Sequence, residues 1–154
     1  MTLDELVDLV TRAMSIVEGF EVTAEEAAAR HIAFPTLPQR LYNPGDIREW
    51  KHNGVAYPEQ SGYVDFLAWA KLQPGSVNPQ AEALAEGWRV LRVLATQYIN
   101  GQYTHGVPPN LIQMIAVYAP ACDKNNPGSY SSVVAAKVGI PADVVLKSLV
   151  TVEA

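Results

Sequence analysis

The sequence predicts a mainly α-helical domain with a small β-hairpin lobe, an α+β fold. Apolar residues recur every three or four positions near the start of the chain and again in its second half, which is typical of amphipathic helices. Between residues 34 and 70 this period is lost, and prolines and glycines interrupt the sequence. With 154 residues, 49% of them hydrophobic, the chain is long enough to bury a core. We therefore expect residues 1–154 to form a single domain, with the 34–70 lobe inserted between helices.

The first helix is expected from about Leu3 to Glu18, with Thr2 as its N-cap. Its apolar face is formed by Leu3, Leu6, Val7, Val10, Met14 and Val17. A step of four from Met14 reaches Glu18, and Gly19 then gives a stop signal. The pattern predicts an inward-facing carboxyl group, and burial would raise its pKa above the ordinary value of about 4.3, as general acid catalysis requires. The alternative is that Glu18 leaves the apolar face at a frayed helix end, where it caps a backbone group or faces solvent.

Shorter elements are expected in the region that follows. Thr23 and Glu26 form a capping-box signature, which predicts a short helix over residues 23–31. Within the lobe, Asn53-Gly54 is a strong hairpin signal, so we expect two small strands around it. Residues 63–67 are apolar enough to form a strand or to begin a helix.

The second half of the chain is expected to be helical. Proline suits the first position of a helix, and Pro79, Pro127 and Pro141 each mark such a start. The longest helix is expected to bury an aromatic face formed by Leu84, Trp88, Leu91, Ala95 and Tyr98. The expected helical ranges are 79–98, 111–118, 127–138 and 141–150.

Composition excludes several classes of partner. The net charge of −5 and the pI of about 5.1 argue against nucleic acid, because phosphate binding needs a basic surface. We expect no membrane partner, because no stretch reaches the ~18 apolar residues of a membrane span. The acidic N-terminus is unlike a secretory signal, so we expect synthesis in the cytoplasm, and any release would need another route. The oligomeric state stays open.

No metal or organic cofactor is expected. The three histidines, His31, His52 and His105, form no pair at three- or four-residue spacing, and Cys122 is the single cysteine. Neither a disulfide within the chain nor a zinc site is therefore supported. Cys122 is interpreted as an ordinary thiol in a turn, and the sequence has no glycine-rich phosphate loop.

Carboxylates interleaved with aromatic residues are the remaining chemical signal. After Glu18, the acidic residues of the lobe are Asp46, Glu49, Glu59 and Asp65, and its aromatic residues are Tyr42, Trp50, Tyr57, Tyr63, Phe66 and Trp69. Aromatic faces suit the C–H patches of sugar rings. The alternative is that these aromatic side chains form the core of a lobe with little regular structure.

Four motifs in order resemble those of lysozyme-like, peptidoglycan-cleaving proteins of phages and bacteria, which include muramidases and lytic transglycosylases. The first two are Glu18-Gly19-Phe20 and Tyr42-Asn43-Pro44-Gly45-Asp46-Ile47-Arg48. The others are Glu86-Gly87-Trp88, and Tyr118-Ala119-Pro120 followed by Asn125-Asn126-Pro127 and Tyr130. The resemblance extends over residues 13–149, nearly the whole chain.

This resemblance implies a lysozyme-like fold and cleavage of the β-1,4 bond between N-acetylmuramic acid and N-acetylglucosamine, with Glu18 as the general acid. Asp46 is the first candidate for a second catalytic group, and Asp65 a poorer one. A second carboxylate at about 5–5.5 Å implies retention of configuration, and one at about 6.5–9.5 Å implies inversion. Without one, Glu18 would act alone, as in lytic transglycosylases, which close an anhydro ring with the sugar's own 6-hydroxyl.

Further residues of the motifs are candidate substrate-binding groups. Asn43 either hydrogen-bonds the substrate or supports the cleft, unless residues 43–45 form a plain turn. Tyr42 and Tyr63 are expected to contact the substrate, and Tyr118 either reaches the Glu18 end of the cleft or belongs to the core.

Two departures from the family pattern favour another class of function. Tyr42 and Asp46 replace the outer asparagines of the usual motif, and the acidic pI differs from that of many basic lysozymes. Asp46 therefore either supplies an extra carboxylate or marks an altered site. The alternative function is that of a non-catalytic structural or sugar-binding protein that keeps the fold.

Overall fold

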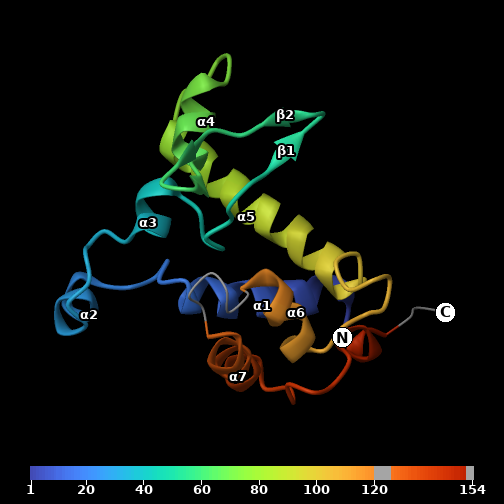
Figure 1. The fold of residues 1–154 in the computed structure, drawn as a ribbon. Helices are drawn as coiled ribbons and strands as arrows, with labels where there is room; N and C mark the ends of the chain where they lie inside the picture. Colours follow the sequence, from blue (N-terminus) through green and yellow to red (C-terminus); the bar gives the residue numbers. More distant parts are fainter. Residues whose placement is uncertain (120–125, 152–154) are drawn as a thin grey trace. The chain divides into compact units, whose positions relative to one another are not determined.

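The computed structural model describes residues 1–119 and 126–151, and these are mostly helical with two small antiparallel strand pairs (Figure 1). This confirms the predicted α+β class. The helices are α1 (Leu3–Val17), α2 (Ala24–Ala29), α3 (Leu37–Leu41), α4 (Phe66–Leu72), α5 (Pro79–Ile99), α6 (Leu111–Tyr118), α7 (Pro127–Val138) and the short 3-10 helix η2 (Leu146–Leu149). The strands are β1 (Lys51–His52), β2 (Val55–Ala56), β3 (Glu59–Gln60) and β4 (Tyr63–Val64).

The chain divides into two compact units. The terminal unit contains Met1–Val17 and the described residues from Arg92 onward, and the central unit contains Glu18–Leu91. α5 begins in the central unit and ends in the terminal unit. Each unit is described by itself below.

The terminal unit is built on α1, α6 and α7. Both α1 and α6 pack against α7, and their fully buried side chains include Leu6, Val10, Met14, Leu111, Met114 and Ile115. Each such side chain stabilises the fold by about 1.5–3 kcal/mol relative to exposure. The predicted first helix is confirmed to within one residue, and its predicted apolar face is the buried one.

The predicted last helix, over residues 141–150, is wrong apart from the short turn of η2. Leu146 N–H donates to the carbonyl of Pro109 at 3.0 Å, and Val145 forms an isolated β-bridge with Asn110. These backbone groups bond to another segment and so cannot bond within a helix. Val145, expected to face inward, is 42% exposed.

Two hairpins lie in the central unit. β1 pairs with β2 around Asn53-Gly54, as predicted, and β3 pairs with β4 around Ser61-Gly62, which the sequence analysis missed. All four turn residues have positive φ, the backbone conformation of a two-residue type I′ turn. Serine at the first position is a weaker signal than asparagine, because asparagine tolerates the left-handed region better.

Helices α3 and α4 flank these hairpins in sequence. The loss of helical period over residues 34–70 gave no sign of α3, which Thr36 and Gln39 cap reciprocally with hydrogen bonds of 2.8 and 3.3 Å. Asp65 caps α4 by accepting from Ala68 N–H at 2.9 Å. Residues 63–67 are thus both of the predicted alternatives, a strand followed by the start of a helix.

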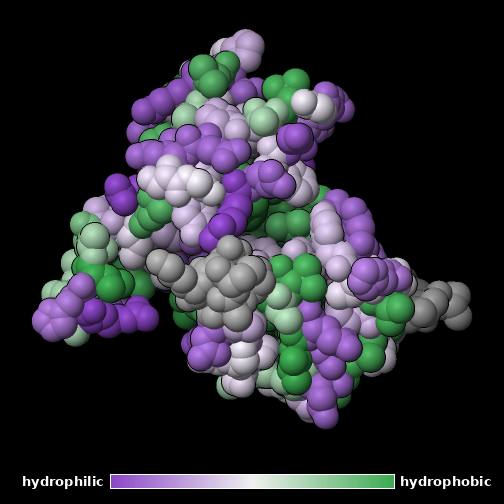
Figure 2. Space-filling view, in the orientation of Figure 1, coloured by the Kyte–Doolittle hydropathy of each residue, from purple (hydrophilic) through white to green (hydrophobic). Residues whose placement is uncertain are grey.

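The long helix α5 begins at Pro79, as predicted, and Asn78 accepts a hydrogen bond from Ala81 N–H at 3.2 Å. Of its predicted buried face, Leu91, Ala95 and Tyr98 are buried and Trp88 is half-buried, but Leu84 is 38% exposed. The sequence analysis missed Ala83, Glu86, Gly87 and Val90, which are also buried. Among the described residues, no helix is both long and apolar enough to cross a membrane. On the face that Figure 2 shows, hydrophobic residues reach the surface at separate places among hydrophilic ones.

Candidate active site

The central unit brings together the two carboxyl groups that the sequence singled out. Glu18 follows α1 directly and is half-buried, and its side chain hydrogen-bonds that of Asp46. Gly19, with a φ of 82°, turns the chain immediately afterwards. Glu18 is thus neither fully buried nor fully exposed, and its neighbour Asp46 is the first candidate for a second catalytic group.

Burial dominates the electrostatics of Asp46 and raises its pKa to about 6. The hydrogen bond with Glu18 and the charge of Arg48 lower that pKa, but by less. A hydrogen bond between two carboxyl groups needs one proton, which the pair shares.

Asp46 also contains a buried acceptor that is not satisfied. Its Oδ1 atom has no hydrogen-bond partner within the described part of the chain. Leaving such an atom without a partner costs about 1–3 kcal/mol. A hydrogen-bond donor from a ligand would remove this cost.

Asn43 holds the turn that presents Asp46. Its side chain is fully buried; Nδ2 donates to the carbonyls of Ile47 at 2.9 Å and Val64 at 3.1 Å, and Oδ1 accepts from Ile47 N–H at 2.8 Å. These bonds tie the turn to strand β4. Of the two roles predicted for Asn43, the observed contacts are those of a residue that supports the site, and the side chain presents no surface to a substrate.

The turn is conformationally strained at both ends. Tyr42 has a φ of 54° and Asp46 a φ of 51°, so both lie in the left-handed region. Asparagine tolerates this region better than most residues, and a side chain that does not fit it costs about 1–2 kcal/mol.

Helix α5 also supports the turn, because Gly87 lies close to Tyr42 and Pro44. A Cβ atom on Gly87 would lie 2.3 Å from the carbonyl oxygen of Tyr42 and 2.9 Å from Cδ of Pro44, so only glycine allows this approach. The next residue, Trp88, packs edge-on against Phe20, with ring centroids 5.8 Å apart. Three of the four motif segments, 18–20, 42–48 and 86–88, therefore contact one another.

The fourth motif segment belongs to the terminal unit. There Tyr118, at the end of α6, packs edge-on against Tyr98 at 5.7 Å, and Tyr130 OH donates to the carbonyl of Met14 at 3.5 Å. Pro120, Cys122 and Asn125 lie outside the described residues, so the predicted turn at Cys122 is not described.

The other candidates of the lobe have different surroundings. Tyr63, half-buried on β4, lies under the guanidinium of Arg48, whose Cζ is 5.4 Å from the ring centroid. Tyr42 is half-buried. Asp65, the poorer second carboxylate, accepts the capping hydrogen bond of α4, which gives its side chain a structural role.

The sequence analysis missed a polar network around Glu86. Tyr57 OH donates to Glu86 Oε2 at 2.6 Å, and Arg89 Nη2 donates to the same oxygen at 3.1 Å. Burial acts to raise the pKa of Glu86, but the hydrogen bonds from Arg89 and Tyr57 have the larger combined effect, so the pKa of Glu86 is lowered. Burial raises the pKa of Tyr57 to about 12. The Glu-x-x-Arg spacing on one helix was the available signal. The network fixes the segment after β2 to α5, with Tyr57 stacked on Trp69 at 5.4 Å.

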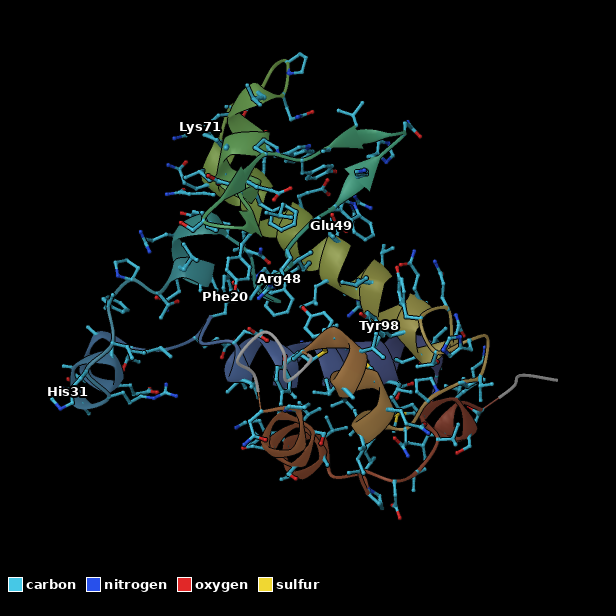
Figure 3. All side chains as sticks on the ribbon, in the orientation of Figure 1. Phe20, His31, Arg48, Glu49, Lys71 and Tyr98 are labelled. Atoms are coloured by element: carbon cyan, nitrogen blue, oxygen red, sulfur yellow. The ribbon has the colours of Figure 1, made fainter. Side chains whose placement is uncertain are left out.

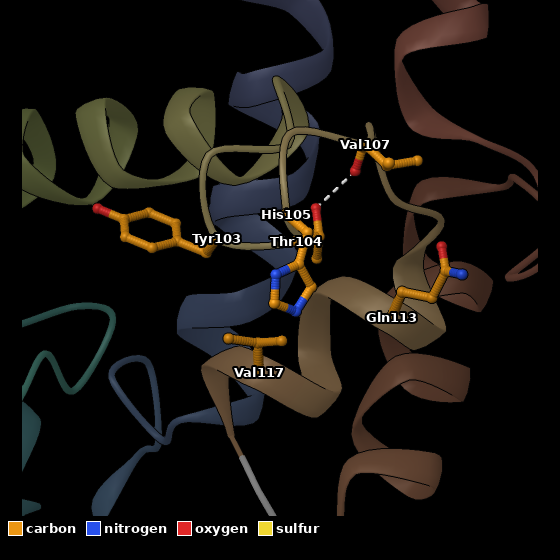
Figure 4. Close-up of a pocket in the computed structure, with 6 residues that line it drawn as sticks. All are labelled: Tyr103, Thr104, His105, Val107, Gln113 and Val117. Carbon is orange, nitrogen blue, oxygen red and sulfur yellow. Dashed lines mark hydrogen bonds between the residues drawn. The ribbon is translucent and has the colours of Figure 1, made fainter.

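Beyond these groups, the described residues can be considered as metal ligands and as the walls of a cavity. They contain no group of three or more His, Cys, Asp or Glu side chains able to hold a metal ion. One cavity of about 340 Å³ lies in the terminal unit and is lined by Tyr103, Thr104, His105, Val107, Gln113 and Val117 (Figure 4). Thr104 Oγ1 donates to the carbonyl of Val107 at 2.6 Å there, and none of the candidate catalytic residues lines this cavity.

Comparison with known proteins gives no match: no protein family, no curated protein and no solved structure is similar to this chain. A function has to be inferred from the residues of the site and their geometry.

Proposed function

We propose that this chain cleaves the glycan strands of peptidoglycan, at the β-1,4 bond between N-acetylmuramic acid and N-acetylglucosamine, with Glu18 as the general acid. The observation that carries the proposal is the hydrogen-bonded Glu18–Asp46 pair. A protonated carboxyl group beside an ionised one is the arrangement that glycosidic cleavage requires. Glu18 is half-buried, so it is neither sealed under side chains nor fully in solvent.

In the proposed reaction, Glu18 protonates the glycosidic oxygen and the leaving sugar departs. Positive charge then develops on the remaining sugar ring, and ionised Asp46 stabilises it. Two carboxyl groups in direct hydrogen bond are closer than the about 5–5.5 Å typical of retaining glycosidases. Substrate binding therefore has to open this hydrogen bond, which turns the proton of Glu18 toward the substrate. Both a hydrolase and a lytic transglycosylase remain compatible with this step.

The surroundings of the pair support the proposal. Mainly helical architecture with small strands is compatible with a lysozyme-like fold, and Asn43 and Gly87 hold the turn that presents Asp46. Tyr42 and Tyr63 are the proposed substrate contacts of the central unit. Tyr118 belongs to the terminal unit, and its contact with the substrate stays a prediction.

A non-catalytic structural or sugar-binding role is the second candidate. It is favoured by Tyr42 and Asp46, which occupy left-handed positions where the family has asparagines. A protein under no catalytic constraint tolerates such substitutions as long as the turn still folds.

The test is digestion of purified peptidoglycan, followed by mass spectrometry of the soluble products. Glu18→Gln keeps the shape of the side chain and removes its acidic proton, so we expect activity to fall at least 10²-fold. Glu21→Gln is the matched control, because Glu21 is exposed nearby and lies outside the pair. Anhydro ends in the products would identify a transglycosylase and reducing ends a hydrolase. No products from the folded wild type would favour the non-catalytic role.

A further inference from the structure

The two carboxyl groups of the Glu18–Asp46 pair are too close to hold a sugar ring between them. Their side chains are in direct hydrogen bond, whereas the carboxyl groups of glycosidases are about 5–5.5 Å apart in retaining and about 6.5–9.5 Å apart in inverting enzymes. In both classes the second carboxyl group acts on the face of the sugar opposite to the leaving oxygen. A pair in contact approaches the sugar from one side, so Asp46 lies on the face at which Glu18 acts.

The backbone around the pair keeps both residues on that side. Thr36 Oγ1 donates to the carbonyl of Gly19 at 2.9 Å, and Phe20, labelled in Figure 3, packs edge-on against Trp88. The turn that presents Asp46 is held by buried hydrogen bonds and by the close approach of α5. A change of side-chain rotamer can therefore open the hydrogen bond of the pair, but it cannot carry Asp46 to the opposite face of a bound sugar.

Asp46 keeps one carboxyl oxygen for a second hydrogen bond. Its Oδ1 atom is buried from solvent and has no partner within the described part of the chain, so the hydrogen bond with Glu18 engages the other oxygen. Bulk water does not reach Oδ1, whereas a bound substrate can bring a hydroxyl group to it once Glu18 turns toward the glycosidic oxygen. The arrangement therefore favours a hydroxyl group of the substrate, and not water, as the donor to Asp46.

The sugar that is cleaved presents one hydroxyl group on this face. In β-linked N-acetylmuramic acid, the C6 hydroxymethyl group and the glycosidic oxygen project from the same face of the ring. We infer that Asp46 is the base that takes the proton of this C6 hydroxyl group, so that O6 and not water attacks the anomeric carbon and the product ends in a 1,6-anhydro ring. This inference rests on the proposed function and adds to it the reaction type and a second role for Asp46.

The proton balance closes within the pair. Glu18 gives its proton to the glycosidic oxygen, the bond from this oxygen to the anomeric carbon breaks, and the electron pair leaves with the departing sugar. O6 forms a bond to the anomeric carbon and passes its proton to Asp46. When the hydrogen bond of the pair forms again, this proton returns to Glu18, so no water is consumed and the pair ends as it began.

The first test is digestion of purified peptidoglycan in oxygen-18 water, followed by mass spectrometry. We expect anhydro ends without oxygen-18 from the wild type, and a loss of about 10²-fold or more in Asp46→Asn. Glu49→Gln is the matched control, because Glu49 is an exposed carboxylate three residues further along the chain (Figure 3). Reducing ends that carry oxygen-18 would overturn the inference and leave the proposed function intact, whereas no products from the folded wild type would overturn both.

The second test blocks the attacking hydroxyl group. On strands acetylated at O6 of N-acetylmuramic acid, the wild type should cleave about 10²-fold more slowly than on the same strands after mild alkaline removal of the ester. Asp46→Asn should lose less than about 10-fold on the acetylated strands, because stabilising charge is the only role left to Asp46 there. Equal wild-type cleavage of both forms, or an equal loss on both forms in Asp46→Asn, would overturn the inference, because Asp46 would then not act on O6.

Discussion

Two turns of the central unit use the same left-handed backbone in opposite ways. In the β1–β2 hairpin, Asn53 and Gly54 have φ values of 51° and 77°, and a Cβ atom on Gly54 would meet nothing within 4 Å. In the turn before Arg48, the left-handed positions are filled by Tyr42 and Asp46. The hairpin turn is stable because its residues suit it, whereas the second turn is held by its surroundings.

The difference shows where this protein stores strain. Buried hydrogen bonds of Asn43 and the close approach of α5 at Gly87 impose the second turn, and the residue it presents is one of the two proposed catalytic carboxyls. Strained backbone that the surrounding structure determines is characteristic of functional sites. The predictions below break or sharpen this contrast, beginning with the largest expected effect.

Gly87→Ala should break the imposed turn most severely. Its Cβ would lie 2.3 Å from the carbonyl oxygen of Tyr42, which is backbone and cannot move freely. We expect a loss of about 3 kcal/mol in the free energy of unfolding, measured by urea denaturation, as for other overpacked sites. Gly54→Ala, in the hairpin turn, meets no atoms and should cost about 1 kcal/mol for its backbone conformation alone. Equal losses in the two variants would contradict the contrast.

Asn43→Ala should remove the hydrogen bonds that hold the turn to β4. The N–H and carbonyl of Ile47 would lose buried partners, at a cost of about 2 kcal/mol. We expect the same denaturation experiment to show this loss together with reduced activity toward peptidoglycan. If Asn43→Ala were as stable as the wild type, the turn would not depend on these hydrogen bonds, and the contrast with the hairpin turn would be contradicted.

Asp46→Asn should stabilise the folded protein above pH 6, whereas Gly87→Ala and Asn43→Ala destabilise it. The folded state raises the pKa of Asp46 from 3.8 to about 6, so the folded protein holds this proton more tightly than the unfolded chain does. Asp46 therefore lowers stability progressively as pH rises from about 4 to about 6, by about 1–2 kcal/mol after allowance for solvent screening. Asp46→Asn should remove that decline and be the more stable protein at pH 7. A parallel pH dependence in both proteins would contradict a raised pKa.

Asn53→Ala should have the smallest effect of this series. Asn53 is exposed, and alanine at its φ of 51° costs about 1 kcal/mol. Thermal unfolding followed by circular dichroism should show a modest fall in melting temperature and unchanged activity. A loss of activity would show that the hairpin turn, too, serves the site.

What the sequence predicted well was local. The period of Leu6, Val10 and Met14 and the start at Pro79 predicted α1 and α5, because helix periodicity and capping act within a few residues. α3 was missed although Thr36 and Gln39 form a capping box, because prolines on either side masked its single turn and a half. The final helix failed because Leu146 bonds to Pro109, a partner far away in the sequence.

The site was predictable in its residues and not in its geometry. Glu18 and Asp46 stood out as carboxylates in motifs, but their hydrogen bond depends on how the central unit folds residues 42–48 against Glu18. The sealed position of Asn43, the contact at Gly87 and the Tyr57–Glu86 hydrogen bond are likewise tertiary, and no spacing along the chain reveals them.

The central claim is that Glu18 and Asp46 share one proton. Carbon-13 NMR of the side-chain carboxyl groups across a pH titration tests it most directly, and it needs no substrate. We predict that Asp46 titrates with an apparent pKa of about 6 and that the signals of Glu18 and Asp46 respond together, as coupled groups do. Titration of Asp46 near its ordinary value of 3.8, with no response at Glu18, would contradict the pair and remove the main support for the proposed catalysis.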